Sequence, residues 1–248
     1  MLKIASEGYP FVAFFAVITI TAFVFGNVWI ALFPFILTVF MLYFFRDPER
    51  QIPDGENIFV SPADGKIILI KNIQGDTIPS LLKGNKDVIA RSFSDEAIFE
   101  SEIATPSARN DMAEVFTGEN GFIEISIFMS PFNVHVNRAP CDGKIKNIQH
   151  NKGKFMAAYK DDASFKNENI EMELETKYGD ILVRQVAGYV ARRAVCRANI
   201  GDSLRRGERY GIIKFSSRLD VYLPKETAIK VKLGDKVKAG ETVIGVVE

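Results

Sequence analysis

Charge is missing from one long stretch of this 248-residue sequence, because no Asp, Glu, Lys or Arg occurs from residue 8 to residue 45. Histidine and cysteine are scarce, with two of each in the whole chain. The histidines, His135 and His150, are too few for a metal site built on several imidazoles, so we predict no bound metal. The two cysteines match no metal-binding or disulfide spacing, which favours a reduced, cytosol-facing compartment.

A net charge is also missing. The 31 basic residues balance the 31 acidic ones, so no overall field attracts nucleic acid, and we predict no nucleic-acid partner. With 47% hydrophobic and 25% charged residues, the composition is that of an ordinary globular protein. The length suggests one or two domains.

The uncharged stretch predicts a membrane-anchoring segment in residues 1–45. A single helix of this length, at about 1.5 Å per residue, would extend well beyond a hydrocarbon core of about 30 Å. The turn-forming pair Gly26-Asn27 divides the stretch. We therefore expect two helices, over roughly 9–25 and 28–45, folded as a hairpin.

Basic residues flank this hairpin, with Lys3 before it and Arg46 and Arg50 after it. By the positive-inside rule, both flanks lie on the cytoplasmic face of the cell membrane. A cleaved signal peptide fits poorly, because the apolar stretch is too long and lacks a basic run at its start. A buried helix pair is the alternative to an anchor, and the choice between a spanning and a half-inserted hairpin stays open.

Residues 46–248 predict a β-rich domain. Runs rich in β-branched residues recur between turn residues, which is typical of strands; they are 66–70, 122–129, 180–190, 210–215, 219–224, 228–233 and 242–248. Residues 76–119 are polar and weakly periodic and suggest a surface excursion with a helix or two. The expected fold is mainly β, of the α+β class: a barrel-like or hybrid β domain preceded by the hydrophobic helical hairpin.

A short internal repeat supports the β reading, because "PADGKI" at 62–67 recurs as "PCDGKI" at 140–145. Asp-Gly between strands is a hairpin turn, and Asp142 is interpreted as structural. The closing stretch "LGDKVKAGETVIG" resembles the hairpin of biotinyl/lipoyl-like hybrid barrels, with Gly234 and Gly240 in its turns. No lysine there has the setting of a carrier site, so this likeness indicates architecture alone.

The stretch "FSSR" at 215–218 places two serines at the head of a predicted strand. Adjacent serines are ordinary in a turn. A serine hydroxyl can instead attack the carbonyl of the residue before it, if the turn is strained and a base takes the proton. β-Elimination and hydrolysis then leave a pyruvoyl ketone at a new N-terminus, which acts as an electron sink like pyridoxal phosphate.

Several further motifs follow one another along the chain: "FFRDPER" (44–50), "SPADG" (61–65), "FMSPFNVHVNRAPCDG" (128–143), "KNENIEME" (166–173) and "RRGERYGIIKFSSR" (205–218). In this order they resemble the motifs of the phosphatidylserine decarboxylases, especially the short prokaryotic type. The resemblance runs from about residue 40 to the C-terminus. It implies a self-cleaving, pyruvoyl-dependent, membrane-associated enzyme of phospholipid biosynthesis. Such an enzyme converts phosphatidylserine to phosphatidylethanolamine through a Schiff base.

By this resemblance, Ser217 is the precursor of the pyruvoyl group and the bond after Ser216 is cleaved. The products are a β chain, residues 1–216, and an α chain, residues 217–248, which form a heterodimer. The family usually has glycine where Ser216 stands, and serine needs about a kilocalorie more to adopt the same strained conformation. Cleavage is still expected. Arg218 follows the nucleophile as an arginine does in the family, which identifies Ser217.

The resemblance also assigns roles to Asp64 and His135. Asp64 acts with a histidine as a proton relay for self-cleavage, although a hairpin Asp-Gly can be purely structural. His135 is the acid/base group, because imidazole titrates near neutral pH. Many family members have a second histidine three residues later, where Arg138 stands here. Arg138 and Arg218 are therefore candidates for stabilising charge or contacting substrate, and His150 is interpreted as structural.

Residues 184–218 carry eight arginines and one lysine against two acidic residues. They form either a solvated sheet face or a basic surface that holds the domain against an anionic phospholipid membrane and its phosphatidylserine. Two rival functions stay open. One is a pyruvoyl decarboxylase for another amino-acid-like substrate, and the other is an uncleaved, catalytically silent membrane-bound hybrid-barrel protein. A higher oligomer is compatible with the sequence.

Overall fold

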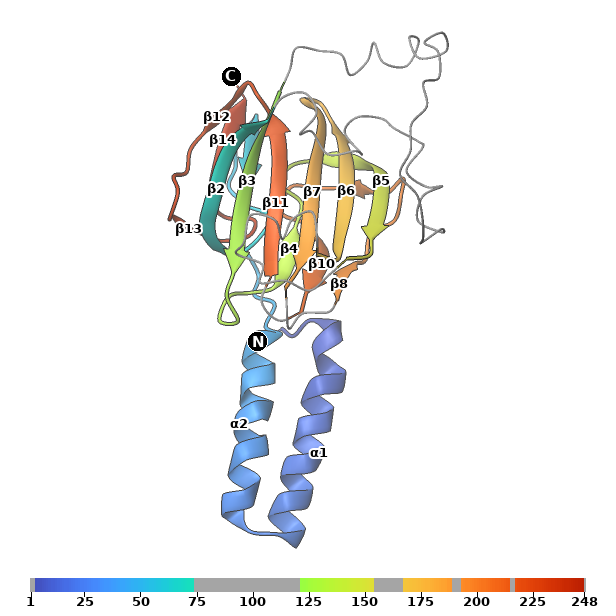
Figure 1. The fold of residues 1–248 in the computed structure, drawn as a ribbon, viewed down its shortest axis with the longest axis vertical. Helices are drawn as coiled ribbons and strands as arrows, with labels where there is room; N and C mark the ends of the chain where they lie inside the picture. Colours follow the sequence, from blue (N-terminus) through green and yellow to red (C-terminus); the bar gives the residue numbers. More distant parts are fainter. Residues whose placement is uncertain (1–2, 74–120, 154–166, 189–192, 215–216, 248) are drawn as a thin grey trace, which may run out of the picture.

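A helical hairpin projects from one end of a β-sheet domain (Figure 1). The computed structural model describes residues 3–73, 121–153, 167–188, 193–214 and 217–247. After a short 3-10 helix η1 (Ser6–Gly8), the hairpin consists of α1 (Tyr9–Phe25) and α2 (Val28–Phe44). The turn between them ends where the Asn27 side chain accepts the Trp29 backbone N–H at 3.0 Å, an N-cap for α2. The predicted hairpin is confirmed.

The hairpin exposes most of its large apolar side chains. Ser6–Phe25 comprises 20 residues of mean hydropathy 2.0, and 6% of its most apolar window is buried. By length and composition this segment can cross a membrane, whereas the 17 residues of α2 extend about 26 Å. Helices in a protein core bury their apolar faces, so the exposed surface argues against a buried helix pair.

Fourteen strands follow in the described part of the chain. They are β1 (Ile58–Val60), β2 (Gly65–Ile73), β3 (Phe122–Met129), β4 (Val136–Arg138), β5 (Gly143–Asn151), β6 (Asn169–Thr176), β7 (Gly179–Ala187), β8 (Ala194–Cys196), β9 (Ser203–Leu204), β10 (Arg209–Ile213), β11 (Ser217–Pro224), β12 (Thr227–Ile229), β13 (Lys236–Val237) and β14 (Val243–Val247). This confirms a mainly β, barrel-like fold after a helical hairpin.

The sheets show that the domain contains one seven-strand unit twice. The large antiparallel sheet has the order β13-β2-β3-β11-β7-β6-β5-β9, and two three-stranded sheets have the orders β1-β14-β12 and β4-β10-β8. Reading outward from the centre of the large sheet, β11-β3-β2-β13 matches β7-β6-β5-β9, and the small sheets match strand for strand. We call β1–β3 with β11–β14 the outer copy, and β4–β10 the inserted copy.

The inserted copy interrupts the outer one between β3 and β11. In the inserted copy itself, the equivalent strands β6 and β7 are joined by a tight turn that pairs Thr176 with Gly179. In the outer copy, the chain leaves after Met129 and returns at Ser217, and these two residues pair in register. We call this place the seam: the end of β3 with the start of β4, and the end of β10 with the start of β11.

Matching sequences build the matching turns, because "GDSLRRGE" at 201–208 parallels "GDKVKAGE" at 234–241. The first glycine of each has φ 94° and the second has φ 76°, a region that glycine adopts most readily. The predicted turn roles of Gly234 and Gly240 are therefore confirmed. In each copy the short strand that follows the first glycine pairs with the strand that begins at Asp-Gly.

The main core lies between the large sheet and the two small ones, where apolar residues of both copies form one cluster. Along β11, Leu219 and Val221 face this core, and Arg218 and Asp220 face the opposite side. Both charged residues are nevertheless buried. All seven predicted strand runs overlap observed strands, whereas the predicted excursion at 76–119 lies outside the described residues.

Candidate active site at the seam

Ser217 is the first residue of β11. This strand begins at the end of the large sheet nearest the helices (Figure 1). Its strand lies between β3 and β7, where Ser217 pairs with Met129 and Ala187. The side chain is fully buried, and its Oγ donates a hydrogen bond to Met129 Sδ at 3.4 Å. A small group at this position is therefore held in an apolar, sulfur-lined setting at a fixed point of the fold.

His135 lies at the seam too, directly before the first residue of β4. Its backbone carbonyl accepts the Ile213 N–H at 3.2 Å, which ties it to the end of β10. The ring Nδ1 lies 3.0 Å from the Asn133 carbonyl oxygen. A carbonyl can only accept, so Nδ1 carries the hydrogen and Nε2 has the free lone pair. Nε2 is buried, and no residue in the described part of the chain forms a hydrogen bond with it.

The electrostatic setting keeps this imidazole neutral. Burial is the main cause that lowers the pKa of His135 to about 4, and the positive charge of Arg46 lowers it further. The hydrogen bond with Asn133 acts in the opposite direction and is outweighed. Near neutral pH the ring is thus a neutral base whose acceptor nitrogen is unpaired within the described ranges.

Two buried amide side chains connect the neighbourhoods of His135 and Ser217. Asn137 lies two residues after His135, inside β4. Asn137 Nδ2 lies 3.9 Å from Met129 Sδ, the atom that Ser217 contacts, and its Oδ1 accepts from Gln185 Nε2 at 2.8 Å. The structure therefore brings His135 and Ser217 to one end of the sheet.

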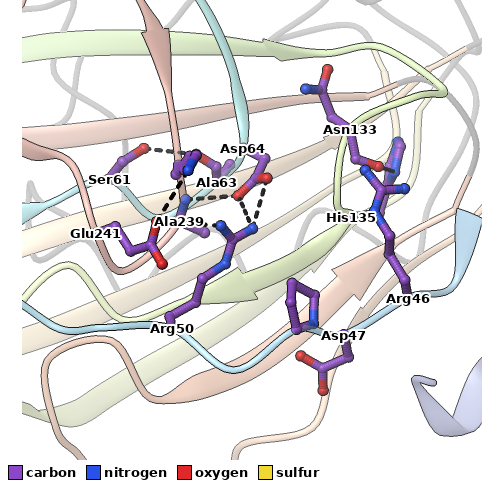
Figure 2. A network of polar contacts seen from close by, with 12 residues as sticks. Arg46, Asp47, Arg50, Ser61, Ala63, Asp64, Asn133, His135, Ala239 and Glu241 are labelled. Carbon is purple, nitrogen blue, oxygen red and sulfur yellow. Dashed lines mark hydrogen bonds and ion pairs between the residues drawn. The ribbon is translucent and has the colours of Figure 1, made fainter. Parts of the chain in front are cut away.

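Asp64 occupies a separate cluster beside the seam (Figure 2). Its carboxylate accepts two hydrogen bonds from Arg50, at 2.9 and 2.8 Å, and one from the Ala239 backbone N–H at 2.8 Å. Within the described residues no hydrogen bond or ion pair joins Asp64 to His135, which points to Asn133 instead. A direct relay between the two would require Asp64 to leave Arg50.

Asp142, the equivalent aspartate of the inserted copy, shows which contact of Asp64 closes a turn and which contact is particular to Asp64. Asp142 Oδ1 accepts the Arg206 backbone N–H at 2.7 Å, just as Asp64 accepts that of Ala239. This shared bond closes the turn, which agrees with a structural role for Asp142. The ion pair with Arg50 occurs at Asp64 alone of the two, so it is the feature that distinguishes the copy next to Ser217.

No described hydrogen bond joins either arginine candidate to Ser217. Arg138 donates to the carbonyl oxygens of Gly207 and Pro48 at 2.8 and 3.0 Å and lies 3.5 Å from Asp47. It therefore holds the segment that follows α2 against the domain.

Arg218 is on the face opposite Ser217, where it bonds Asp220 at 2.6 Å and Ser126 at 2.7 Å. It also lies 3.4 Å from Glu124. This buried network fixes β11 to β3, its neighbour on the side of Met129.

The basic stretch 184–218 forms much less of a basic surface than its composition suggests. Arg184 and Arg218 are buried, the former against Glu171 at 2.6 Å. Arg197 pairs with Glu7, and Arg209 pairs with Asp47 at 2.8 Å. Four of the nine basic residues in this stretch are thus paired with carboxylates within the fold. Of the remaining candidates, His150 is an exposed residue of β5, the cysteines are free thiols, and Ser216 lies outside the described residues.

Sequence reasoning did not find Arg50, Asn137 or Gln185. Arg50 and Asn137 stand inside quoted motifs, "FFRDPER" and "HVNRAP", but neither residue type is an acid or base near neutral pH. Gln185 lies in a strand with no motif at all. The sequence does hold one signal for Arg50. The repeat places Asp64 and Asp142 in equivalent turns, so a role for Asp64 alone requires a partner that Asp142 lacks.

The buried pair of Arg50 and Asp64 predicts a stability effect. Both side chains are nearly buried, with 8% and 11% exposed. Arg50→Ala would leave Asp64 charged without its partner, at a cost of about 3 kcal/mol. Lys3→Ala is the control, because Lys3 and Glu49 are exposed and such pairs contribute less than about 1 kcal/mol. Thermal unfolding of uncut protein in detergent measures both, and equal shifts would contradict the assignment.

The fold and the site together define a class of protein: an antiparallel β-sheet enzyme with a buried serine and a neutral imidazole where its domain meets an apolar helical hairpin. A profile of the phosphatidylserine decarboxylase family matches residues 37–245. The chain belongs to the phosphatidylserine decarboxylase family, which confirms the family and the class of enzyme predicted from the motifs.

Individual relatives match over nearly their full length. A phosphatidylserine decarboxylase proenzyme of Geobacter metallireducens is 42% identical over 248 aligned residues, which cover 98% of this chain and 95% of the relative. The proteins of the same name from Citrifermentans bemidjiense and Syntrophus aciditrophicus are 43% and 40% identical, over 251 and 244 residues. Each alignment covers 98% of this chain and 96% of the relative.

Proposed function

We propose that this chain is a membrane-attached proenzyme that cleaves itself before Ser217 and then decarboxylates phosphatidylserine to phosphatidylethanolamine. The observation that carries the proposal is the seam. It holds a buried serine at the start of a strand and a neutral imidazole whose Nε2 has no hydrogen-bond partner among the described residues. A nucleophile and a base are what an acyl shift at a serine requires. The function places the chain in phospholipid biosynthesis.

In the proposed self-cleavage, Ser217 Oγ attacks the carbonyl carbon of residue 216, and His135 Nε2 accepts the hydroxyl proton. The C–N bond breaks and an ester forms, with the proton returned to the amine of residue 217. Loss of the Cα proton then expels the ester oxygen as the new C-terminal carboxylate of residues 1–216. Water hydrolyses the resulting dehydroalanine, ammonia leaves, and a ketone remains at residue 217.

This pyruvoyl ketone supplies a carbonyl that binds the substrate amine and draws electrons from the bond to the carboxylate. The residues present fit such a group, because position 217 is fully buried beside Met129 and Ala187. Neither of these side chains carries an amine, thiol or hydroxyl that would add to the ketone. Asn137 and Gln185 supply amide groups near it. His135 is the group positioned to take or return a proton there.

The position of the seam supports a substrate in the bilayer. The hairpin projects from the same end of the domain at which β11 begins (Figure 1). Arg46 and the Tyr43 hydroxyl donate to the Phe132 carbonyl at 2.7 and 3.2 Å, which fixes the β3–β4 loop to the end of α2. A headgroup at the membrane surface would lie on the side of the domain where the site is. The flanking Lys3, Arg46 and Arg50 favour a cytoplasmic position for this side.

Two features support an α/β heterodimer after cleavage. The α chain, 217–248, contributes β11 to the centre of the large sheet, where it pairs along its length with β3 and β7. Its Arg218 also bonds across to Ser126 of the β chain inside the buried network. Breaking one peptide bond at the seam removes none of these contacts, so the products remain one folded unit.

One assay separates the proposed function from its rivals. The full chain is reconstituted into vesicles containing phosphatidylserine, and CO2 release and phosphatidylethanolamine formation are measured beside a gel of the protein. We expect two bands and conversion of the lipid, with free L-serine unreacted. Decarboxylation of free serine would favour a soluble amino-acid substrate. One uncut, inactive band would favour the silent protein.

A further inference from the structure

The end of the anchor contacts the candidate base directly. Phe44, the last residue of α2, lies with its ring centroid 4.2 Å from that of His135, at an interplanar angle of 33°. Both residues are fully buried. A ring centroid at this distance is in van der Waals contact, so the phenyl group covers one face of the imidazole.

This contact belongs to a cluster shared by the anchor and the catalytic domain. Phe44, Phe45 and Met41 from the end of α2 pack with Val136 and Ile212 from the strands of the seam. Phe45 in turn stacks on Phe11 of α1 with centroids 5.4 Å apart. The hairpin is therefore joined to the site by a continuous apolar core as well as by the chain.

Among the residues that the structure describes, the polar groups around His135 are few. On the side of the anchor, Arg46 is the charged group that acts on it, and Arg46 is held by bonds to the Tyr43 and Phe132 carbonyls, each at 2.7 Å. On its own loop, Asn133 provides a carbonyl. On β4 and β10, the cluster contributes valine and isoleucine side chains. The anchor thus supplies the ring that keeps water off the imidazole.

We propose that the membrane anchor is part of the active site, and that Phe44 is a positioning residue that orients His135 and excludes water from it. This inference rests on the proposed role of His135 as the base for self-cleavage. It assigns the hairpin a second task besides holding the domain at the membrane. A chain whose anchor has not docked would have a misplaced, hydrated imidazole, so docking and maturation are coupled.

The pH dependence of self-cleavage distinguishes positioning from simple folding. With a pKa of about 4, His135 is neutral from about pH 5.5 to 8, and the parent chain should mature at the same rate throughout. In Phe44→Ala, water reaches the ring and the pKa rises toward its ordinary value of 6.5. The base is then mostly protonated at about pH 5.5, so cleavage should be about tenfold slower there than at about pH 8.

The experiment uses the full chain, synthesised briefly in a cell-free system with phosphatidylcholine vesicles and then moved to buffers across this pH range. The uncut fraction is followed on a gel, without an activity assay. Phe40→Ala is the matched control. Phe40 lies one turn earlier on α2 and is half-buried, with its ring 6.1 Å from that of Phe44. It should keep the parental pH profile.

Three results would overturn the inference, and they differ from a failure of the proposed function. Phe44→Ala could mature at the parental rate at every pH, could slow equally at every pH, or could share its profile with Phe40→Ala. If Phe44→Ala does not fold, Phe44→Val removes less apolar volume but still uncovers part of the imidazole face, and a flat profile for it counts against the proposal. By contrast, parental maturation of His135→Ala would remove the proposed base itself.

Discussion

The Ser217→Ala variant will remain a single uncut chain and will release no CO2 from phosphatidylserine. An alanine methyl cannot attack a carbonyl, so neither the ester nor the ketone can form. The substitution removes one buried oxygen whose described hydrogen bond is to a sulfur atom, so the fold should persist. A gel shows the uncut chain, and circular dichroism shows the fold. A variant that still cleaves would identify a different nucleophile.

Two neighbouring variants serve as controls for this result. Ser61→Ala removes another fully buried serine hydroxyl, which donates to the Ala63 carbonyl at 2.7 Å, and it should mature normally. Ser216→Gly restores the residue usual in the family and should mature at least as fast as the parent, because glycine adopts strained backbone conformations at lower cost. A clear slowing of Ser216→Gly would show that its hydroxyl takes part in the chemistry.

The second large effect is expected for His135→Ala, which should accumulate as uncut precursor. A positioned general base contributes roughly a hundredfold or more to the rate of a proton-transfer step. Arg138, which stands where many relatives have a second histidine, cannot replace it, since a guanidinium has no acceptor. The measurements are the cleaved fraction over time and CO2 release per pyruvoyl group. The matured fraction should also turn over slowly.

Asp64→Asn provides the contrast that separates the two steps. If Asp64 serves self-cleavage, this variant should lose more maturation than turnover per pyruvoyl group. The bond from the Ala239 N–H can persist with an amide oxygen, whereas the charge that holds Arg50 is lost. Equal loss in both measurements would show that Asp64 acts through the stability of the fold. A His135→Ala protein with parental maturation and turnover would refute the base assignment.

The elements that could be predicted from sequence are those with strong local signals. The helical hairpin follows from an uncharged stretch and one Gly-Asn break, and the strands β3 and β11 follow from dense β-branched runs. The strands β5 and β6 carry many polar residues because charged side chains pair across the sheet, as Lys146 does with Glu173 at 3.4 Å. Neither strand therefore contains a dense run of β-branched residues, and neither is predicted from the sequence.

The duplication and the seam could not be derived from local patterns. One internal echo was visible at Asp64 and Asp142, but the matching "GDSLRRGE" and "GDKVKAGE" segments are needed to reveal two complete copies. The pairing of Met129 with Ser217 shows that the chain, after the inserted copy, returns to the position beside the end of β3. That return explains why a loop after β3 and a serine far along the chain form one site.

The predicted partnership of Asp64 with a histidine illustrates a further limit of the sequence. A motif gives the residue types but not their contacts, and here Arg50 from the segment after the helical hairpin binds the carboxylate. The same segment provides Asp47 to Arg138 and Arg209. Contacts between residues so distant in sequence have no periodicity, so only the folded chain discloses them.

The measurement that tests the central claim most directly is the intact mass of the purified full-length protein. We expect two species: residues 1–216 with a free carboxylate, and residues 217–248 with a ketone in place of the serine amine. The smaller species should resist Edman degradation and should gain mass on reduction with cyanoborohydride in the presence of an amine. A single mass equal to the uncut chain, or a fragment that begins at residue 216 or 218, would contradict the account.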